Sequence, residues 1–310
     1  MYPNARNRDN VRMRLLSNIS TRLGLLLARL LGHLPLGLSR RLLRPLSPLM
    51  RLTMSRRRRI VERNLELCFP DWPQQRRTEV MRAHFLQLAE AIAEIAFCWC
   101  HRGRLDQRYG DVVGLEHLDV ARRSGRGVLL VTGHVTCLEL AARLFAERVE
   151  VRGIYRPLRN SLLNDFQNTG RGRYSPGMIK RDNLRAMIRY LRASEVLWYA
   201  PDQDFGPDRS EFAPFFGIPT ATARGLLDLA RLGNAVVVPM YPVKDETTGR
   251  ITVTIRPAFD HFPSSDPVDD LTRFNAFLEH HIRQAPSQYW WLHRRFKTAP
   301  QGHSARYLEK

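Results

Sequence analysis

The chain has 310 residues, enough for one sizeable core but few for two full domains. With 44% hydrophobic and 25% charged residues it has the composition of a globular protein, which excludes a largely disordered chain. The net charge of +19 is uneven, because residues 1–60 hold 14 arginines, no lysine and one acidic residue. Such an asymmetry predicts a polyanionic partner, either nucleic acid or an anionic lipid surface.

The leucine-rich segment 15–38 is predicted to form a basic amphipathic helix. At ~3.6 residues per turn its polar residues, including Arg22, Arg29 and His33, fall on an arc of about 100°. A helix of this kind lies in the membrane interface. A bilayer span would instead place Arg29 in hydrocarbon, at a cost of about 2.5–3.5 kcal/mol. The alternative is an ordinary helix whose apolar stripe faces the protein core.

The basic residues favour a membrane over nucleic acid as the partner. They are interleaved with leucines, and the sequence has no helix-turn-helix, zinc-finger, RRM or KH signature. We therefore predict an anionic membrane surface as a partner and no nucleic acid. We assign residues 1–59 to a basic N-terminal membrane-associating segment and residues 60–310 to a single catalytic domain.

Residues 60–100 are predicted to be helical, with a break at residues 69–73. Beyond them, strands alternate with helices, which predicts an α/β fold with a mostly parallel central sheet flanked by helices. A long polar segment separates the second strand from the next helix. The predicted strands are 128–132, 150–155, 195–200, 235–240 and 250–256, and the predicted helices are 135–148, 182–193, 222–232 and 268–285.

Three candidate groups follow predicted strands: His134, the turn that contains Arg156, and Asp202. The carboxyl ends of parallel strands meet at one edge of a sheet, where open α/β sheets bind ligands. Imidazole is the side chain best suited to exchange a proton near neutral pH. Glu139 lies five residues after His134, about 140° around a helix, so the two converge only if His134 precedes the helix. Gly133 permits such a turn, and the alternative is a capping histidine with a surface glutamate.

The sequence around the remaining candidate residues is less distinctive. Arg171 lies between two glycines and is suited to bind phosphate bidentately, although a solvated loop arginine is the alternative. The aromatic and basic stretch 290–297 is either a wall of a binding site or a surface segment. The four cysteines have no Cys-x-x-Cys spacing and are predicted to be reduced thiols facing the cytoplasm. Cys137 is not expected to be a nucleophile.

The chain resembles the lipid A biosynthesis (secondary, lauroyl-type) acyltransferases from about residue 15 to about residue 307. Each motif alone is common, but their order and spacing together are specific. Ala299 departs from the family pattern, in which an arginine follows Phe-Lys-Thr. The matching segments are Thr132-Gly133-His134 through Glu139, Tyr155-Arg156-Pro157, Asn168 to Arg173, Val196 to Asp204, Pro214-Phe215-Phe216-Gly217 and Gln288 to Thr298.

The resemblance implies a function and a set of residues. His134 is the expected general base, with Glu139 orienting its imidazole, and Arg171, Asp202 and Arg156 are expected to bind substrate. The resemblance assigns Asp202 to substrate or arginine pairing, in preference to the metal site that its neighbours Asp204 and Asp208 would suggest. We expect no metal and no cofactor.

The expected reaction is acyl transfer from acyl carrier protein to a hydroxyl of a Kdo-bearing, phosphorylated lipid A precursor. The expected location is the cytoplasmic face of the cell inner membrane. The alternatives are a glycerolipid or ornithine-lipid O-acyltransferase with the same histidine–acid chemistry, and a non-catalytic membrane-binding protein. Acyl-chain length, the hydroxyl that is acylated and the oligomeric state are not predicted.

Overall fold

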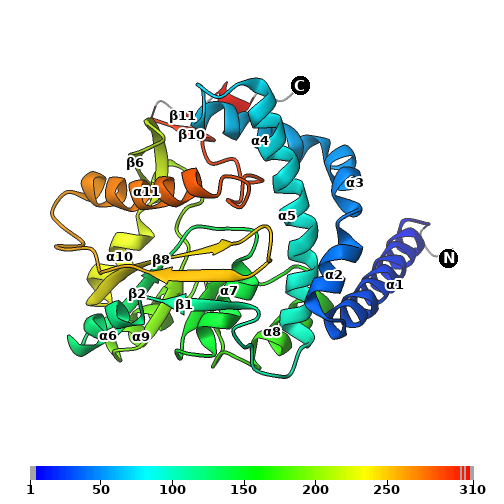
Figure 1. Ribbon diagram of the computed structural model, residues 1–310, viewed down its shortest axis with the longest axis horizontal. Coiled ribbons are helices and arrows are strands. Elements are labelled where there is room, and N and C mark those ends of the chain that lie inside the picture. Colours follow the sequence, from blue (N-terminus) through cyan, green and yellow to red (C-terminus); the bar gives the residue numbers. More distant parts are fainter. Residues whose placement is uncertain (1–4, 301, 304, 308–310) are drawn as a thin grey trace.

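The computed structural model describes residues 5–300, 302–303 and 305–307, and the side chains from Ile19 onward except those of the residues near the C-terminus whose placement is uncertain. Its centre is a seven-stranded sheet in the order β1-β9-β8-β2-β5-β3-β4 (Figure 1). All neighbouring strands are parallel except β8 and β9, so the predicted mostly parallel sheet is confirmed. The strands are β1 Gly110–Val113, β2 Gly127–Val131, β3 Arg152–Tyr155, β4 Met178–Lys180, β5 Val196–Tyr199, β8 Ala235–Lys244 and β9 Ile251–Ile255.

Strand β2 shows why the sheet lies inside the molecule. All five of its residues, Gly127 to Val131, are buried. Because successive side chains of a strand point to opposite faces, burial of the whole run requires cover on both faces. That cover comes from helices α6 Leu115–Arg123, α7 Leu138–Ala146, α9 Leu184–Arg192, α10 Gly225–Leu232 and α11 Pro267–Gln284, which contact the strands.

Several elements were not predicted, and they share a weak sequence signal. The polar segment after β3 contains a helix, α8 Ser161–Arg171, whose N-cap Asn160 accepts a hydrogen bond from Leu163 N. Strands β1 and β4 are short and only partly buried. The hairpin of β6 Ser210–Phe215 and β7 Ile218–Ala223 lies outside the central sheet. Two short strands, β10 Thr298–Ala299 and β11 Gly302–His303, pair near the C-terminus.

The predicted break at 69–73 is confirmed as the boundary between α4 Ser55–Cys68 and α5 Gln74–Cys100. Helix α5 crosses the molecule beside the sheet and contacts both α7 and α8 (Figure 1). Among the described residues, α5 is the one helix long and apolar enough to cross a membrane, but 72% of its apolar window is buried in the protein. Its apolar character is accounted for by packing.

The arginine-rich stretch after α1 forms two short helices, α2 Leu36–Leu43 and α3 Leu46–Thr53, which pack on α5. Two ion pairs hold α2 in place, one buried and one half exposed: Arg40 Nε lies 3.0 Å from Glu94 Oε1, and Nε of Arg44, the residue after α2, lies 2.8 Å from Glu90 Oε1. Lys244 Nζ from β8 donates to both of these glutamates. The predicted boundary between two segments at residue 59 stays a prediction. Helices α2 and α3, which precede it, contact α5, which follows it.

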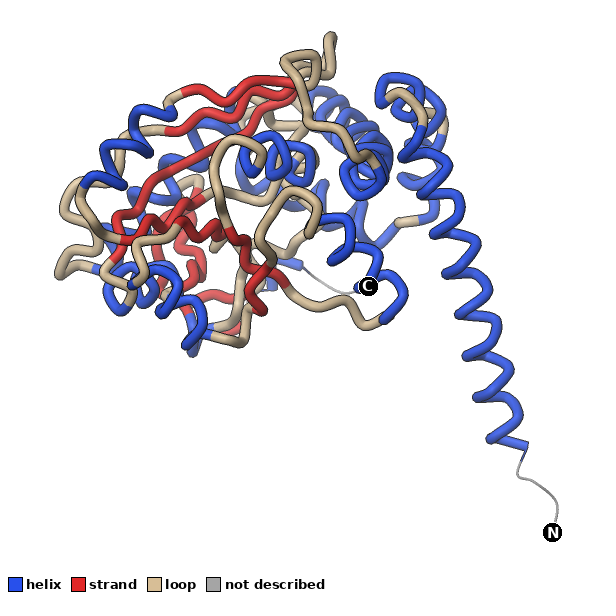
Figure 2. The backbone as a smooth tube through the Cα atoms, turned by 90° about the horizontal axis from the view of Figure 1, so that it is seen from below, coloured by secondary structure: helices blue, strands red, loops and turns tan. Residues whose placement is uncertain are grey.

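Helix α1, Ala5–His33, extends beyond the rest of the molecule (Figure 2). Its C-terminal part packs on α5 and α8. Large apolar side chains of α1 are exposed, and exposed leucines continue along α2 and α3. The exposed side chains are Ile19, Leu23, Leu26, Leu27, Leu30, Leu38, Leu42, Leu49 and Leu52. An apolar surface of this extent on a protein indicates contact with something other than water.

Candidate active site

His134 lies in a turn between β2 and α7, just past the carboxyl end of β2. The turn is held by main-chain hydrogen bonds from a segment far along the chain. Trp290 N donates to His134 O at 3.0 Å, and Thr136 N donates to Gln288 O at 2.8 Å. The stretch around residue 290 therefore positions the histidine.

Asp202 forms the closest contact with His134. The two residues converge because β2 and β5 are neighbouring parallel strands and both residues follow the carboxyl ends. His134 Nδ1 lies 2.5 Å from Asp202 Oδ1, and the main-chain N of His134 donates to Asp202 Oδ2 at 2.8 Å. Nδ1 therefore carries the proton that the carboxylate accepts, which leaves Nε2 as the basic ring nitrogen.

The environment of this pair sets its charge. Burial would raise the pKa of Asp202, but the His134 imidazole and its hydrogen bonds lower it to about 2. For His134, burial favours the neutral ring, but the charge and hydrogen bond of Asp202 outweigh it and raise the pKa above its usual value. The aspartate side chain is 2% exposed and the imidazole 30% exposed, so only the histidine is open to an incoming group.

Close packing favours glycine at position 133. Its φ lies outside the left-handed region, contrary to the expectation that the turn needs glycine's backbone freedom. An added Cβ would lie 3.0 Å from Leu278 Cδ2 and 3.4 Å from Asp202 Oδ2. A side chain here would crowd Leu278 and would lie in van der Waals contact with the carboxylate that holds His134.

Glu139 belongs to a second cluster. It lies in the first turn of α7 and accepts hydrogen bonds from Arg171 Nε at 2.8 Å and Nη2 at 2.5 Å. Trp99 Nε1 donates to it at 2.6 Å, and the Tyr174 hydroxyl donates at 2.9 Å. The expected pairing of Glu139 with the imidazole is therefore wrong in this geometry, since Asp202 occupies Nδ1. The reason is topological: β5 ends beside β2, whereas Glu139 faces α5 and α8.

The glutamate is ionised in this cluster. Burial would raise the pKa of Glu139, but the charge of Arg171 and the hydrogen bonds from Arg171, Trp99 and Tyr174 lower it. The same carboxylate raises the pKa of Arg171 against the effect of burial. Arg171 is the last residue of α8, which corrects the expectation of a loop. Two of its nitrogens are turned toward Glu139, so the pair is preformed.

Both clusters face one cavity of about 120 Å³. His134, Glu139, Arg171 and Tyr174 provide its polar part. The remaining wall is mostly apolar and comes from α7, β3, β4 and β5: Leu138, Ala142, Ala146, Val151, Ile154, Met178 and Trp198. The cavity therefore combines a base with a surface suited to a hydrocarbon chain.

Arg156 is the candidate that the structure places apart from this cavity. It follows β3 at the same edge of the sheet, as predicted, but its side chain is exposed and it does not line the cavity. The aromatic and basic stretch is more buried than expected of a surface segment. Arg295 and Trp291 are almost fully buried, and Arg295 donates to Ala221 O and Thr222 Oγ1, which is a structural role.

The neighbouring acid Asp204 is also structural. Its carboxylate accepts hydrogen bonds from Thr298 N, Thr298 Oγ1 and Gly206 N, which ties the Asp202 loop to the C-terminal stretch. Within the described part of the chain, no cluster of three or more His, Cys, Asp or Glu side chains is arranged to hold a metal ion. Cys137 is fully buried, and burial raises its pKa to about 12, so it is a packed thiol.

Trp99 and Tyr174 are the two site residues that sequence reasoning missed. Trp99 lies near the end of α5, and Tyr174 follows α8, so neither is close in sequence to the histidine. A tryptophan in an apolar helix carries no signal of its own. Tyr174 lies three residues after Arg171, and this proximity is the one feature of the sequence that places it near the site.

The fold and this geometry together define an α/β enzyme of a particular class. A histidine–aspartate pair at the ends of two parallel strands can take a proton from a hydroxyl, and the apolar cavity beside it can hold the group transferred to that hydroxyl. A base and an apolar binding site are what an acyltransferase with a lipophilic substrate requires.

Comparison with known proteins identifies the family. The model of the bacterial lipid A biosynthesis acyltransferases matches residues 7–298. The chain is 39% identical over 260 residues to a lipid A biosynthesis lauroyltransferase of Escherichia coli (strain K12), covering 82% of this chain and 83% of the relative. It is 36% identical to a palmitoleoyltransferase of that strain (82% and 83% covered) and 30% identical to a myristoyltransferase (83% and 79%). The chain belongs to the lipid A biosynthesis acyltransferases.

Proposed function

We propose that this acyltransferase moves a fatty acyl chain from acyl carrier protein to a hydroxyl of a Kdo-bearing lipid A precursor, with His134 as the general base. The observation that carries the proposal is the imidazole held by Asp202 at an apolar cavity. A base of this kind, beside a site for a hydrocarbon chain, fits a reaction between an alcohol and an acyl thioester.

The proposed step begins at Nε2 of His134, which accepts the proton of the acceptor hydroxyl. The hydroxyl oxygen attacks the thioester carbonyl and forms the ester bond as the carbon–sulfur bond breaks. The departing thiolate takes the proton back from the imidazolium. Asp202 holds the ring in the productive tautomer and stabilises its charged form, as the carboxylate of a histidine–acid pair does elsewhere.

In this proposal Glu139 acts through Arg171. The ionised glutamate holds the guanidinium at the cavity wall through Nε and Nη2, which leaves Nη1 without a contact to this carboxylate. A fixed cation there suits an oxygen that becomes negative as the thioester is attacked. Arg171 and Asp202 stay in the proposed site, with Asp202 now assigned to His134. Arg156 is proposed as a substrate contact at the exposed rim.

The acyl chain is proposed to lie along the apolar wall of the cavity. The small side chains Ala142, Ala146 and Gly153 leave space there, and an added Cβ on Gly153 would come within 2.6 Å of Met178 Cε. The relatives carry different acyl names, lauroyl, palmitoleoyl and myristoyl. The residues that line this wall are therefore the first place to look for chain-length preference.

We further propose that α1, α2 and α3 hold the enzyme on the cytoplasmic face of the inner membrane. The exposed leucines of these helices would enter the interface, and the nearby arginines would meet anionic headgroups. The same positive charge suits acyl carrier protein, which is an acidic partner. Deleting residues 1–34, which removes α1 and keeps α2 and α3, should weaken binding to anionic vesicles, and equal partitioning of both forms would contradict this role of α1.

The decisive experiment compares lipid A from cells with and without this chain by mass spectrometry. The proposal predicts a mass difference of one fatty acyl group on lipid A. An unchanged lipid A profile, with a change in glycerolipids or ornithine lipids instead, would favour the alternative O-acyltransferase. His134→Ala in the same cells is the control that separates catalysis from the presence of the protein.

A further inference from the structure

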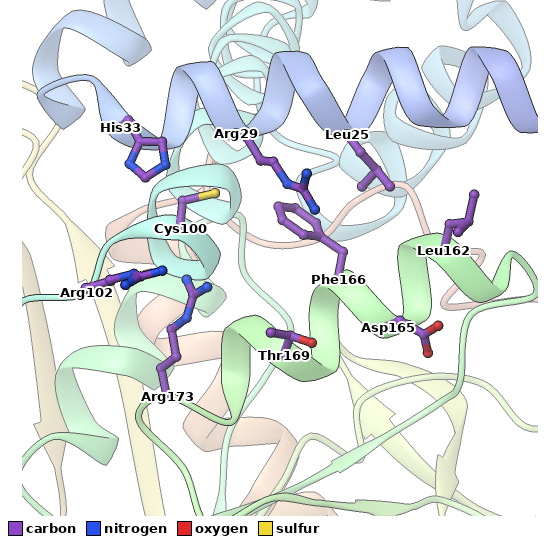
Figure 3. A pocket seen from close by; sticks show the side chains of 10 residues that line it. All are labelled: Leu25, Arg29, His33, Cys100, Arg102, Leu162, Asp165, Phe166, Thr169 and Arg173. Atoms are coloured by element: carbon purple, nitrogen blue, oxygen red, sulfur yellow. The ribbon is translucent and has the colours of Figure 1, made fainter.

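A second cavity, of about 460 Å³, lies between α1, the end of α5 and α8 (Figure 3). It shares no lining residue with the cavity that His134, Glu139 and Arg171 line, which we call the reaction cavity. Four of its lining side chains are basic: Arg29 and His33 point into it from α1, and Arg102 and Arg173 reach in from the other side. We name this space the cationic cavity. Asp165 is the one acidic residue among the described side chains that line it.

The walls of the cationic cavity are built by close helix contacts. An added Cβ on Gly32 would lie 2.4 Å from Ala96 O, so α1 packs directly on α5. Gly170 brings α8 equally close to α5, since its Cβ would meet Trp99 Cβ at 2.5 Å. These contacts fix the turn of α1 that carries Arg29 and His33. The cationic side chains are therefore gathered by the packing of three helices.

Two of the three guanidinium groups are held by contacts that do not neutralise their charge. Arg29 lies over the Phe166 ring at 5.7 Å, and Arg173 donates to the main-chain oxygen of Trp99. Within the described part of the chain, Arg29, Arg102 and Arg173 form no ion pair with a carboxylate. These arginines and His33 are exposed, so water and salt screen their mutual repulsion, but an anion between them would still be attracted by several positive charges at once.

Trp99 connects this cavity to the reaction site. Its indole N–H donates to Glu139, its main-chain oxygen accepts from Arg173, and its ring packs against Phe166 at 5.6 Å. A molecule with an anionic group in the cationic cavity would thus lie beside the reaction cavity. The outer wall of the cationic cavity is α1, whose leucines are exposed on other sides of the helix.

We infer that the cationic cavity binds a phosphomonoester carried by a lipid. Arginine forks match phosphate oxygens bidentately, and basic pockets between helices at a membrane surface take lipid headgroups. Two sources offer this chemistry: the phosphate of the lipid acceptor, or the head of a neighbouring anionic membrane lipid. The assignment to the acceptor rests on the proposed function, whereas binding of the phosphomonoester itself does not.

The first test measures binding of the full-length protein to phosphatidylcholine vesicles that contain phosphatidic acid. Arg29→Gln/Arg102→Gln should weaken binding roughly tenfold or more, the loss of two charge-assisted contacts. The matched control is Arg41→Gln/Arg59→Gln, which removes two exposed charges outside the cavity and should weaken binding only about twofold. Equal losses in the two double variants would overturn the site.

Two further measurements separate loss of the binding site from misfolding and from loss of catalysis. Arg102 is exposed, so Arg102→Gln alone should fold normally, and it should still weaken vesicle binding more than Arg41→Gln alone. His134→Ala should bind these vesicles as the unmodified protein does. If no acyl transfer is found with any acceptor but the binding difference remains, the proposed function fails and the site stands.

The second test identifies the source of the phosphate. Acyl transfer is measured in neutral detergent micelles that hold no other anionic lipid. A rise of roughly tenfold in KM for the acceptor in Arg29→Gln/Arg102→Gln, with kcat unchanged, supports the acceptor phosphate. An unchanged KM together with weaker vesicle binding supports a membrane lipid. A rise in KM for acyl carrier protein alone would overturn the proposal and assign the cavity to the donor.

Discussion

The two carboxylates beside the reaction cavity differ in whether their partner can change its charge. Asp202 is paired with His134, whose ring is partly exposed and whose pKa the aspartate raises, whereas Glu139 is paired with Arg171, which stays charged at all physiological pH values. The first pair can change its protonation state, and the second cannot. The comparison indicates that proton transfer belongs to His134 and Asp202, while Glu139 and Arg171 provide a fixed charge arrangement.

The largest expected effect comes from His134→Ala. Loss of a positioned base should lower kcat by about 10²–10⁴-fold, with little effect on folding because the ring is partly exposed. The assay uses purified protein with an acyl carrier protein thioester, and circular dichroism checks the fold. Near-normal turnover in a folded variant would end the assignment of His134 as the base.

Asp202→Asn tests the titrating pair directly. Removal of the carboxylate charge should lower kcat by on the order of 10²-fold, because the imidazolium loses its partner. Because Asp202 raises the pKa of His134, the variant should also lower that pKa. The acidic limb of the pH–rate profile, where the base becomes protonated, should therefore move to lower pH. A loss of rate with an unmoved limb would mean that Asp202 acts on something other than the histidine.

The pair should also link stability to pH. The raised pKa of His134 contributes stability that is present below its unfolded value and is lost as pH rises through the folded value. The lowered pKa of Asp202 contributes stability that is present above its unfolded value and is lost as pH falls toward about 2. Melting temperatures of the Asp202→Asn variant should lack both dependences, and parallel curves for the two proteins would contradict this linkage.

Glu139→Gln probes the pair that does not titrate. The variant keeps the shape of the side chain but leaves Arg171 without its counter-charge, so it should lower stability by about 1–3 kcal/mol. We also expect kcat to fall without movement of the acidic limb. Urea unfolding and a pH–rate profile measure the two effects. A shifted limb would restore Glu139 as a partner of the imidazole.

The smallest effect on total activity is expected from Ala146→Phe. The larger ring should fill the apolar end of the cavity and lower kcat/KM for long acyl chains relative to short ones by roughly tenfold. Competition between two acyl carrier protein thioesters of different length gives the ratio. An unchanged ratio would mean that the chain does not lie along α7, and it would leave the roles of the two carboxylates untouched.

Part of this molecule could be predicted from the sequence because the signal is local. The apolar run before His134 and the run before Asp202 predict buried parallel strands, and strand ends on one sheet edge predict that the two residues are neighbours. The leucine and arginine pattern of residues 15–38 predicts an amphipathic helix without knowledge of its neighbours. The family motifs predict which residues belong to the site.

What tertiary structure decided is which residue touches which. Strand order places β5 beside β2, so Asp202 reaches the imidazole, and the packing of α8 on α5 brings Arg171, Trp99 and Tyr174 to Glu139. No local sequence pattern predicts these contacts, because the partners lie tens of residues apart. The sequence by itself determined the strands that precede His134 and Asp202 and the candidate residues, whereas strand order determined the His134–Asp202 pair and the packing of α1, α5 and α8 determined the Glu139–Arg171 pair and the cationic cavity.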